Sequence, residues 1–202
     1  MKPASSIMMQ QVFKTIMIMK NTNIHEGIIL IPDFSGFTEF VFNTKLYTGE
    51  YIVRQLLSTL IDINDQYFDI SEIEGDAILF YRYDNHPSYE NISTMLWKMR
   101  NAFNQKIKEL SKELSMSIDM SLKFIVHYGK FSQYTIGSFK KLYGKTVVEA
   151  HQMLKNEFAE QPSYALFSNS FLENSGNRES EAHTQKYHLP EGGMIHYFES
   201  VN

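Results

Sequence analysis

Apolar residues in the first part of the chain alternate between short continuous runs and runs with helical spacing. Residues 27–32 are almost all apolar, a pattern typical of a buried central strand. Residues 50–64 carry apolar side chains every three or four positions, which predicts a helix. Residues 67–72 and 77–83 flank the turn 74–76, so this stretch predicts a hairpin whose second strand is apolar.

The next part of the chain repeats this helix-and-hairpin order. Apolar residues at helical spacing over 95–114 predict a long amphipathic helix. Residues 118–128 partly alternate and indicate a strand that ends at Gly129, with 131–136 returning as the second arm of a hairpin. Residues 145–158 again have helical spacing.

The C-terminal region has a different character. Residues 173–186 are polar and predict a mobile loop, and residues 187–198 predict a closing pair of short strands. The whole order is that of an α+β fold, with a mostly antiparallel sheet covered on one face by helices. It resembles the ferredoxin-like arrangement.

Residues 1–24 contain an apolar run at 7–19 that is interrupted by Gln10, Gln11 and Lys14. The run has no clean signal-peptide core and is too short and too polar to span a bilayer. Two interpretations stay open: an N-terminal extension to a domain formed by residues 25–202, or a helix whose methionine-rich side packs on a partner.

Composition narrows the classes of function. Of 202 residues, 43% are hydrophobic and 21% charged, which is a soluble globular composition. The absence of cysteine excludes disulfides, a cysteine nucleophile and thiolate metal sites. A net charge of −4 argues against broad binding to nucleic acid or to an anionic membrane. The missing signal-peptide core and the missing cysteines predict a cytoplasmic protein. The charge predicts no nucleic-acid or membrane partner, and it still permits one small phosphorylated ligand.

Two aspartates are placed where a metal ion could bind. Asp33 ends the first apolar strand, and Asp76 lies in the tip of the first hairpin. If the two strands are neighbours, the carboxylates converge, as hard cations such as Mg²⁺ require. Gly36 follows in a turn whose backbone N–H groups could approach phosphates. Spacing alone leaves a second interpretation open, because an aspartate in a turn is often only a turn or capping residue.

Four segments together resemble the class III adenylate and guanylate cyclases. Residues 29–38 are similar to the first metal motif of that family, and residues 74–80 to the second. Residues 126–129 resemble its strand ending in His-x-Gly, and residues 144–150 the opening of its dimer-facing helix. The order matches across residues 27–170, and the start of the first motif also resembles an uncharacterised bacterial family of cyclase-like domains.

The resemblance implies a ferredoxin-like nucleotide cyclase fold that uses Mg²⁺ or Mn²⁺ and a purine nucleoside triphosphate. It also implies a site formed between two such domains, in a homodimer or in a heterodimer with another cyclase-like chain. Matched residue by residue, it makes Asp33 and Asp76 the metal-binding aspartates, with the carbonyl of Phe34 as a backbone ligand. The phosphate-binding turn of the family falls on Gly36, Phe37 and Thr38.

Other family positions hold different residues here. The base-recognising lysine is replaced by Glu72 and its aspartate partner by Lys141, either as a charge-swapped pair or as two unrelated surface residues. The transition-state asparagine and arginine fall on Val148 and Gln152. Valine cannot hydrogen-bond and glutamine carries no charge, whereas charge stabilisation is a large catalytic term in phosphoryl transfer.

These departures leave three hypotheses. The first is a cyclase-like domain that binds a nucleotide with metal but has weak or lost activity, as a signalling sensor or a pseudo-enzyme. The second is an active cyclase that forms a cyclic nucleotide and pyrophosphate. The third is a structural or interaction domain in which both aspartates are relics.

Overall fold

The computed structural model of the protein describes residues 24–155, 163–176, 184–188 and 194–199. The predicted extension at residues 1–24 lies outside the described residues, except that Ile24 begins the first strand. The middle of the predicted loop 173–186 and the end of the predicted helix 145–158 also lie outside them.

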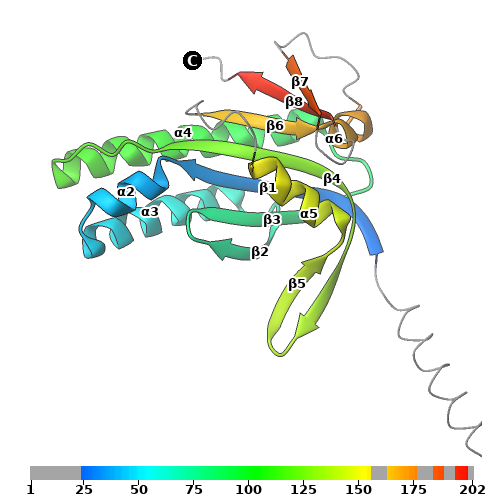
Figure 1. Ribbon diagram of the computed structural model, residues 1–202, viewed down its shortest axis with the longest axis horizontal. Coiled ribbons are helices and arrows are strands. Elements are labelled where there is room, and N and C mark those ends of the chain that lie inside the picture. The colour runs from blue at the N-terminus through cyan, green and yellow to red at the C-terminus, as the bar shows by residue number, and fades with distance from the viewer. Residues whose placement is uncertain (1–23, 156–162, 177–183, 189–193, 200–202) are drawn as a thin grey trace, which may run out of the picture.

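The described strands form one sheet in the order β2-β3-β1-β4-β6-β8-β7, with β5 paired to β4 beside this path (Figure 1). Only the pairing of β4 with β6 is parallel among these strands, so the predicted mostly antiparallel sheet is confirmed. The bounds are β1 Ile24–Ser35, β2 Asp69–Glu74, β3 Ala77–Tyr83, β4 Ser121–Ile136, β5 Phe139–Tyr143, β6 Tyr164–Ser168, β7 Thr184–His188 and β8 Met194–Glu199.

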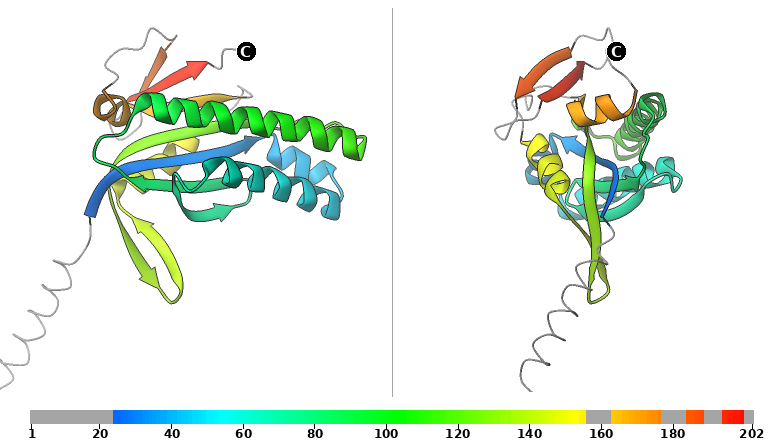
Figure 2. Two further views of the ribbon diagram at one scale, coloured as in Figure 1. Left: turned by 180° about the vertical axis from the view of Figure 1, so that it is seen from behind. Right: turned by 90° about the vertical axis from the view of Figure 1, so that its right-hand side faces the viewer.

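Helices cover both faces of this sheet (Figure 2). Helices α3 and α4 pack on one face, whereas α5 packs on the other. The prediction that helices cover one face only is therefore wrong. The bounds are α2 Phe37–Asn43, α3 Leu46–Asn64, α4 Tyr89–Leu114, α5 Lys145–Leu154 and α6 Asn169–Asn174.

Strand β1 shows why both faces are covered. Ile28 and Leu30 enter the core beneath α3 and α4, and Ile29 and Ile31 enter the core beneath α5. Side chains alternate between the two faces of a strand, so a continuous apolar run is the pattern of a strand that is buried on both sides. All four side chains are fully or almost fully buried.

Strand β4 departs from the prediction at Gly129. The strand continues through this glycine to Ile136, and the return arm of the hairpin is β5. Gly129 pairs with Gly27 of β1, and a Cβ atom at Gly129 would lie 2.5 Å from Oγ1 of Thr146. The glycine therefore permits close approach of α5 to the strand and does not end it. The resulting β4–β5 arm projects from the body of the sheet (Figure 1).

The C-terminal strands agree with the prediction in kind. Strands β7 and β8 pair antiparallel with each other, and β8 also pairs with β6. Strand β7 begins at Thr184, inside the segment predicted as a loop. Among the described residues, no helix has both the length and the apolar character needed to cross a bilayer.

Candidate metal and phosphate site

The two aspartates singled out by the sequence lie at the same end of the sheet. Strand β1 is the neighbour of β3, and Asp33 pairs with Ala77, the residue that follows Asp76. Both aspartates line one pocket of about 370 Å³. The condition for convergence of the two carboxylates, that their strands be adjacent, is therefore met.

The rest of this pocket comes mainly from the turn that connects β1 to α2. Gly36 in this turn has φ 83°, a left-handed conformation that favours glycine. A Cβ atom there would lie 2.6 Å from the carbonyl oxygen of Asp119, so a larger residue would also clash. The residues that complete the lining are Phe34, Ser35, Gly36, Phe37, Thr38, Glu39 and Lys123.

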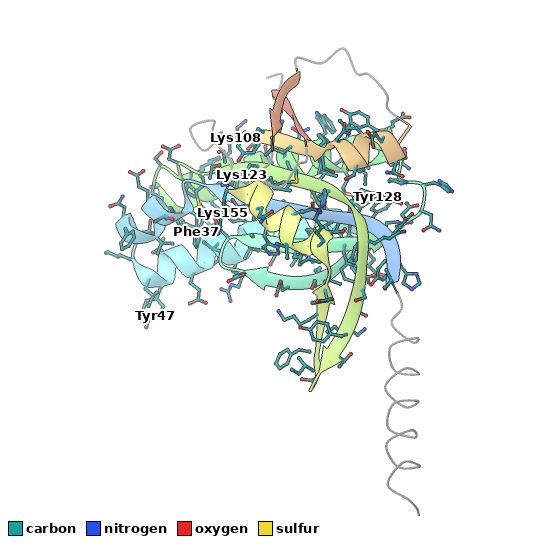
Figure 3. The ribbon with its side chains drawn as sticks, turned by 45° about the vertical axis from the view of Figure 1, so that its right-hand side comes forward. Phe37, Tyr47, Lys108, Lys123, Tyr128 and Lys155 are labelled. Atoms are coloured by element: carbon teal, nitrogen blue, oxygen red, sulfur yellow. The ribbon has the colours of Figure 1, made fainter. Side chains whose placement is uncertain are left out.

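Lys123 is the member of this site that sequence reasoning missed. It lies on β4 directly opposite Asp33, and its Nζ atom is 2.7 Å from Oδ2 of Asp33. The two side chains are only 18% and 15% exposed. Figure 3 labels Lys123 and Phe37, which belong to this end of the sheet. The available signal was the single charge within the apolar run 122–126, since a buried charge requires a partner.

The electrostatics of the pocket are those of two carboxylates and one ammonium group. Burial, followed by the charge of Asp33, raises the pKa of Asp76 to about 6, against hydrogen bonds from its own backbone and that of Phe34 and the charge of Lys123. Burial lowers the pKa of Lys123, but its hydrogen bond to Asp33 and the charge of Asp33 more than offset this, and the net pKa is raised. Lys123 is therefore a cation at neutral pH.

This donor set suits a hard divalent cation that is shared with a ligand. Asp33 and Asp76 supply carboxylate oxygens, and the desolvated negative charge of Asp76 is what a bound cation would stabilise. Among the described residues, no group of three or more histidine, cysteine, aspartate or glutamate side chains could hold a metal by itself. Backbone, water or phosphate oxygens would have to complete the shell, which is the usual manner of Mg²⁺ binding.

A second pocket, of about 270 Å³, adjoins the first and shares Asp33 and Asp76 with it. Glu72 of β2 and His151 of α5 are among its lining residues, and four apolar residues also line it: Ile31, Ala77, Leu79 and Leu154. Glu72 accepts a hydrogen bond from the ammonium group of Lys141, which comes from β5. The residues at the two base-recognition positions, Glu72 and Lys141, thus form an ion pair with each other.

The two residues at the transition-state positions of the cyclase resemblance lie on α5, and neither side chain is buried. The side chain of Val148 is 56% exposed, and Gln152 is half-buried. Two cationic groups of β5 and α5 form ion pairs: Lys145 pairs with Glu149 at 3.2 Å, and Lys141 pairs with Glu72. Nδ1 of His151 lies 2.8 Å from the carbonyl oxygen of Val147.

Several solved nucleotide cyclases have a similar arrangement of elements. The guanylyl cyclase Cya2 superposes with a TM-score of 0.69 at 14% identity, over 90% of this chain and 95% of that chain. The adenylyl cyclase CyaB from P. aeruginosa gives 0.68 at 12% identity, over 90% and 97%. The guanylate cyclase domain of RhGC from Catenaria anguillulae, solved in complex with GTP, gives 0.60 at 17% identity, over 86% and 95%.

The fold is therefore that of the class III cyclase catalytic domains, and the predicted fold and resemblance are confirmed. Residues 53–164 match the family described as "Protein of unknown function (DUF2652)", which covers more than half of the chain. The chain belongs to this family. No curated protein matches its sequence.

Proposed function

We propose that this chain binds a purine nucleoside triphosphate together with Mg²⁺ or Mn²⁺, and that its cyclase activity is weak or lost. The observation that carries the proposal is the single pocket lined by Asp33, Asp76 and the turn after β1. Carboxylates on one side and backbone N–H groups on the other are the chemistry that a metal-bound triphosphate requires. The solved neighbour in complex with GTP supports the choice of ligand class.

Each part of this pocket has a separate role in the proposal. Asp33, Asp76 and the carbonyl oxygen of Phe34 would hold the metal, and Gly36, Phe37 and Thr38 would surround the phosphates. A divalent cation bound there would neutralise triphosphate charge and favour ionisation of the ribose 3′-hydroxyl. Because Gly36 has no Cβ, the turn can pack against the carbonyl oxygen of Asp119, which holds it beside the pocket.

Recognition of the base would fall to Glu72 and Lys141. A carboxylate can accept hydrogen bonds from the N1–H and N2–H₂ groups of guanine while it also accepts one from Lys141. Glu72 lines the pocket that adjoins the metal site, which makes it accessible to a ligand.

Weak or lost turnover follows from α5. Val148 lacks the amide group, and Gln152 lacks the guanidinium group, that the cyclase resemblance places at these two positions. Losing an arginine that stabilises a phosphoryl-transfer transition state typically costs about 10³–10⁵ in rate. Such a chain would act as a nucleotide sensor, or would complete the site of a second cyclase-like chain in a homodimer or heterodimer.

A thermal-shift experiment tests the proposal. The chain is melted with ATP, GTP, CTP or UTP, each with Mn²⁺ or Mg²⁺, and the same samples are analysed for cyclic nucleotide. A ligand at 100 times its dissociation constant stabilises the folded state by about 2.7 kcal/mol. We expect a shift with a purine nucleotide and metal, with little or no product. The absence of a shift with every nucleotide would refute the proposal.

An active cyclase is the second candidate, and the intact metal and phosphate half of the site favours it. It predicts the same thermal shift, accompanied by cyclic nucleotide and pyrophosphate in equal amounts. Light scattering on the same samples would show whether a dimer forms. A structural domain, the third hypothesis, predicts neither a shift nor a product.

A further inference from the structure

The ammonium group of Lys123 lies where a cation bound to Asp33 would have to lie. Its Nζ atom is 2.7 Å from Oδ2 of Asp33, which is the distance of a charge-assisted hydrogen bond. Both side chains are mostly buried, so this ion pair is screened by solvent less than a surface pair. The pair also lies in the pocket that contains Asp76.

We infer that Lys123 is an internal counter-ion that competes with the divalent metal for Asp33, so that metal and nucleotide bind strongly only together. This inference rests on the proposed function, and it adds a coupling between the two ligands of the site. The coupling arises because Lys123 pairs with Asp33 before binding and with the phosphates afterwards.

Three steps lead to this coupling. A divalent cation that arrives alone must separate Lys123 from Asp33, which leaves a mostly buried ammonium group without its partner, at a substantial cost. A triphosphate that arrives alone brings negative charge beside Asp33 and Asp76, which repel it. When both arrive, the metal replaces the ammonium group on Asp33, and the ammonium group can turn to phosphate oxygens.

The backbone register fixes Lys123 for this purpose. Asp33 and Lys123 are cross-strand partners in β1 and β4, and the neighbouring pairs Ile31–Ile125 and Ile29–His127 belong to the same continuous ladder. Directly opposite side chains in adjacent strands have Cβ atoms about 4.5–5.5 Å apart. The backbone of Lys123 is therefore held in place, and its ammonium group can move only by rotation of the side chain within the pocket.

The coupling is measured as two affinities in two proteins. Mn²⁺ binding is followed by electron paramagnetic resonance, alone and in the presence of 3′-deoxy-ATP or 3′-deoxy-GTP, which cannot cyclise. In the natural protein we expect the nucleotide to raise the affinity for Mn²⁺ at least tenfold. By linkage, Mn²⁺ must raise the affinity for the nucleotide by the same factor.

The Lys123→Met variant should change the two affinities in opposite directions. Affinity for Mn²⁺ alone should rise about tenfold or more, because the competing ammonium group is gone. Affinity for the nucleotide in the presence of Mn²⁺ should fall, because the phosphates lose a cation. A variant that merely damaged the fold would weaken both, and loss of a simple phosphate contact would leave Mn²⁺ binding unchanged.

Three further variants complete the experiment. Lys130→Met removes an exposed lysine of the same strand, paired with Glu26 at 3.3 Å, and should change neither affinity. Lys123→Arg keeps the charge and should restore weak binding of Mn²⁺ alone. Lys123→Gln keeps a hydrogen-bond donor without charge, and it replaces the methionine variant if that protein does not fold.

The outcomes separate this inference from the proposed function. If the natural protein binds Mn²⁺ with nucleotide and the uncharged variants bind Mn²⁺ alone no better than it does, the inference is overturned and the proposed function stands. If no nucleotide binds to the natural protein, yet removal of the Lys123 charge strengthens Mn²⁺ binding, the proposed function fails and competition for Asp33 stands.

Discussion

The end of the sheet around Asp33 and the surface formed by β2, β5 and α5 are the two halves of the candidate site, and they are built differently. Around Asp33, strand register places the groups: Asp33 pairs with Ala77 on one side and with Lys123 on the other. On the opposite half, Glu72 and Lys141 form a partly exposed ion pair, and Val148 is 56% exposed.

The two halves differ in how strongly the fold of this chain constrains them. In the half around Asp33, strand pairing within one chain brings Asp33, Asp76 and Lys123 together, and none of these three side chains is exposed. The half on α5 and β5 lies on the surface, where a substitution usually changes the stability of the protein very little. A chain can therefore keep the first half intact while the second half changes, which is the pattern expected of a domain that binds a nucleotide without efficient turnover.

The sharpest test of this comparison is Asp76→Asn. Loss of one of the two carboxylates should lower metal-dependent nucleotide affinity by about a hundredfold or more, since even groups behind a metal ligand contribute 10–100-fold. Isothermal titration with Mn²⁺ and 3′-deoxy-GTP or 3′-deoxy-ATP measures the change. Asp62→Asn, on an exposed face of α3, is the matched control and should bind normally. Unchanged affinity in Asp76→Asn would show that the metal site has been assigned to the wrong residues.

A gain of function would test the second half. Val148→Asn combined with Gln152→Arg restores the residues that the cyclase resemblance places on α5, and we expect product formation with Mn²⁺ to rise about tenfold or more. Chromatographic detection of cyclic nucleotide measures the change. The pair Val148→Asn and Gln152→Met carries no new charge and should remain as slow as the natural protein. Efficient formation of cyclic nucleotide by the natural protein would show that the half on α5 does not limit activity.

The smallest expected effect concerns stability without metal. The pKa of Asp76 is raised from 3.8 to about 6, so the folded state binds a proton more tightly than the unfolded state. Its contribution to stability is therefore fully present below about pH 3.8 and is lost as the pH rises through about 6. At pH 7 in EDTA, Asp76→Asn should be more stable than the natural protein by about 1 kcal/mol, after allowance for solvent screening of a half-buried group.

Urea unfolding at several pH values measures this difference. The advantage of the asparagine variant should be nearly constant above pH 6 and should shrink as the pH falls from about 6 to about 4. An advantage that is independent of pH would mean that the charge of Asp76 is not its source, because substitution at a turn can act through backbone preference instead.

The strands and helices that position the site could be predicted largely from the sequence. The run 27–32 and the hairpin around Gly75 have local signals that place Asp33 and Asp76 at strand ends. Helices α3 and α4 start at Leu46 and Tyr89, earlier than predicted. The first turn of α3 holds Leu46 and Tyr47, whose exposed apolar side chains do not follow the periodicity of its buried face. The run 28–31 also carried the signal for a second covered face, since an apolar residue at every position is buried on both sides.

Lys123 and the ion pair of Glu72 with Lys141 could not be predicted in the same way. The partners in these pairs are separated by about 90 and 69 residues, and nothing local reveals the register between distant strands. The β4–β5 arm was misassigned for a related reason. A glycine inside a strand and a glycine at a strand end look alike in sequence, and only the approach of Thr146 distinguishes them.

The ladder between β1 and β4 also protects the site against insertions and deletions. It runs without interruption from Ile24–Ser132 to Ser35–Ser121. Removing one residue from β1 would exchange odd and even positions, which would turn Ile29 and Ile31 out of their core at the same time as it separated Asp33 from Lys123. An insertion or deletion in β1 that would separate Asp33 from Lys123 would therefore also disrupt the hydrophobic core and prevent folding. The core and the candidate site depend on the same strand register.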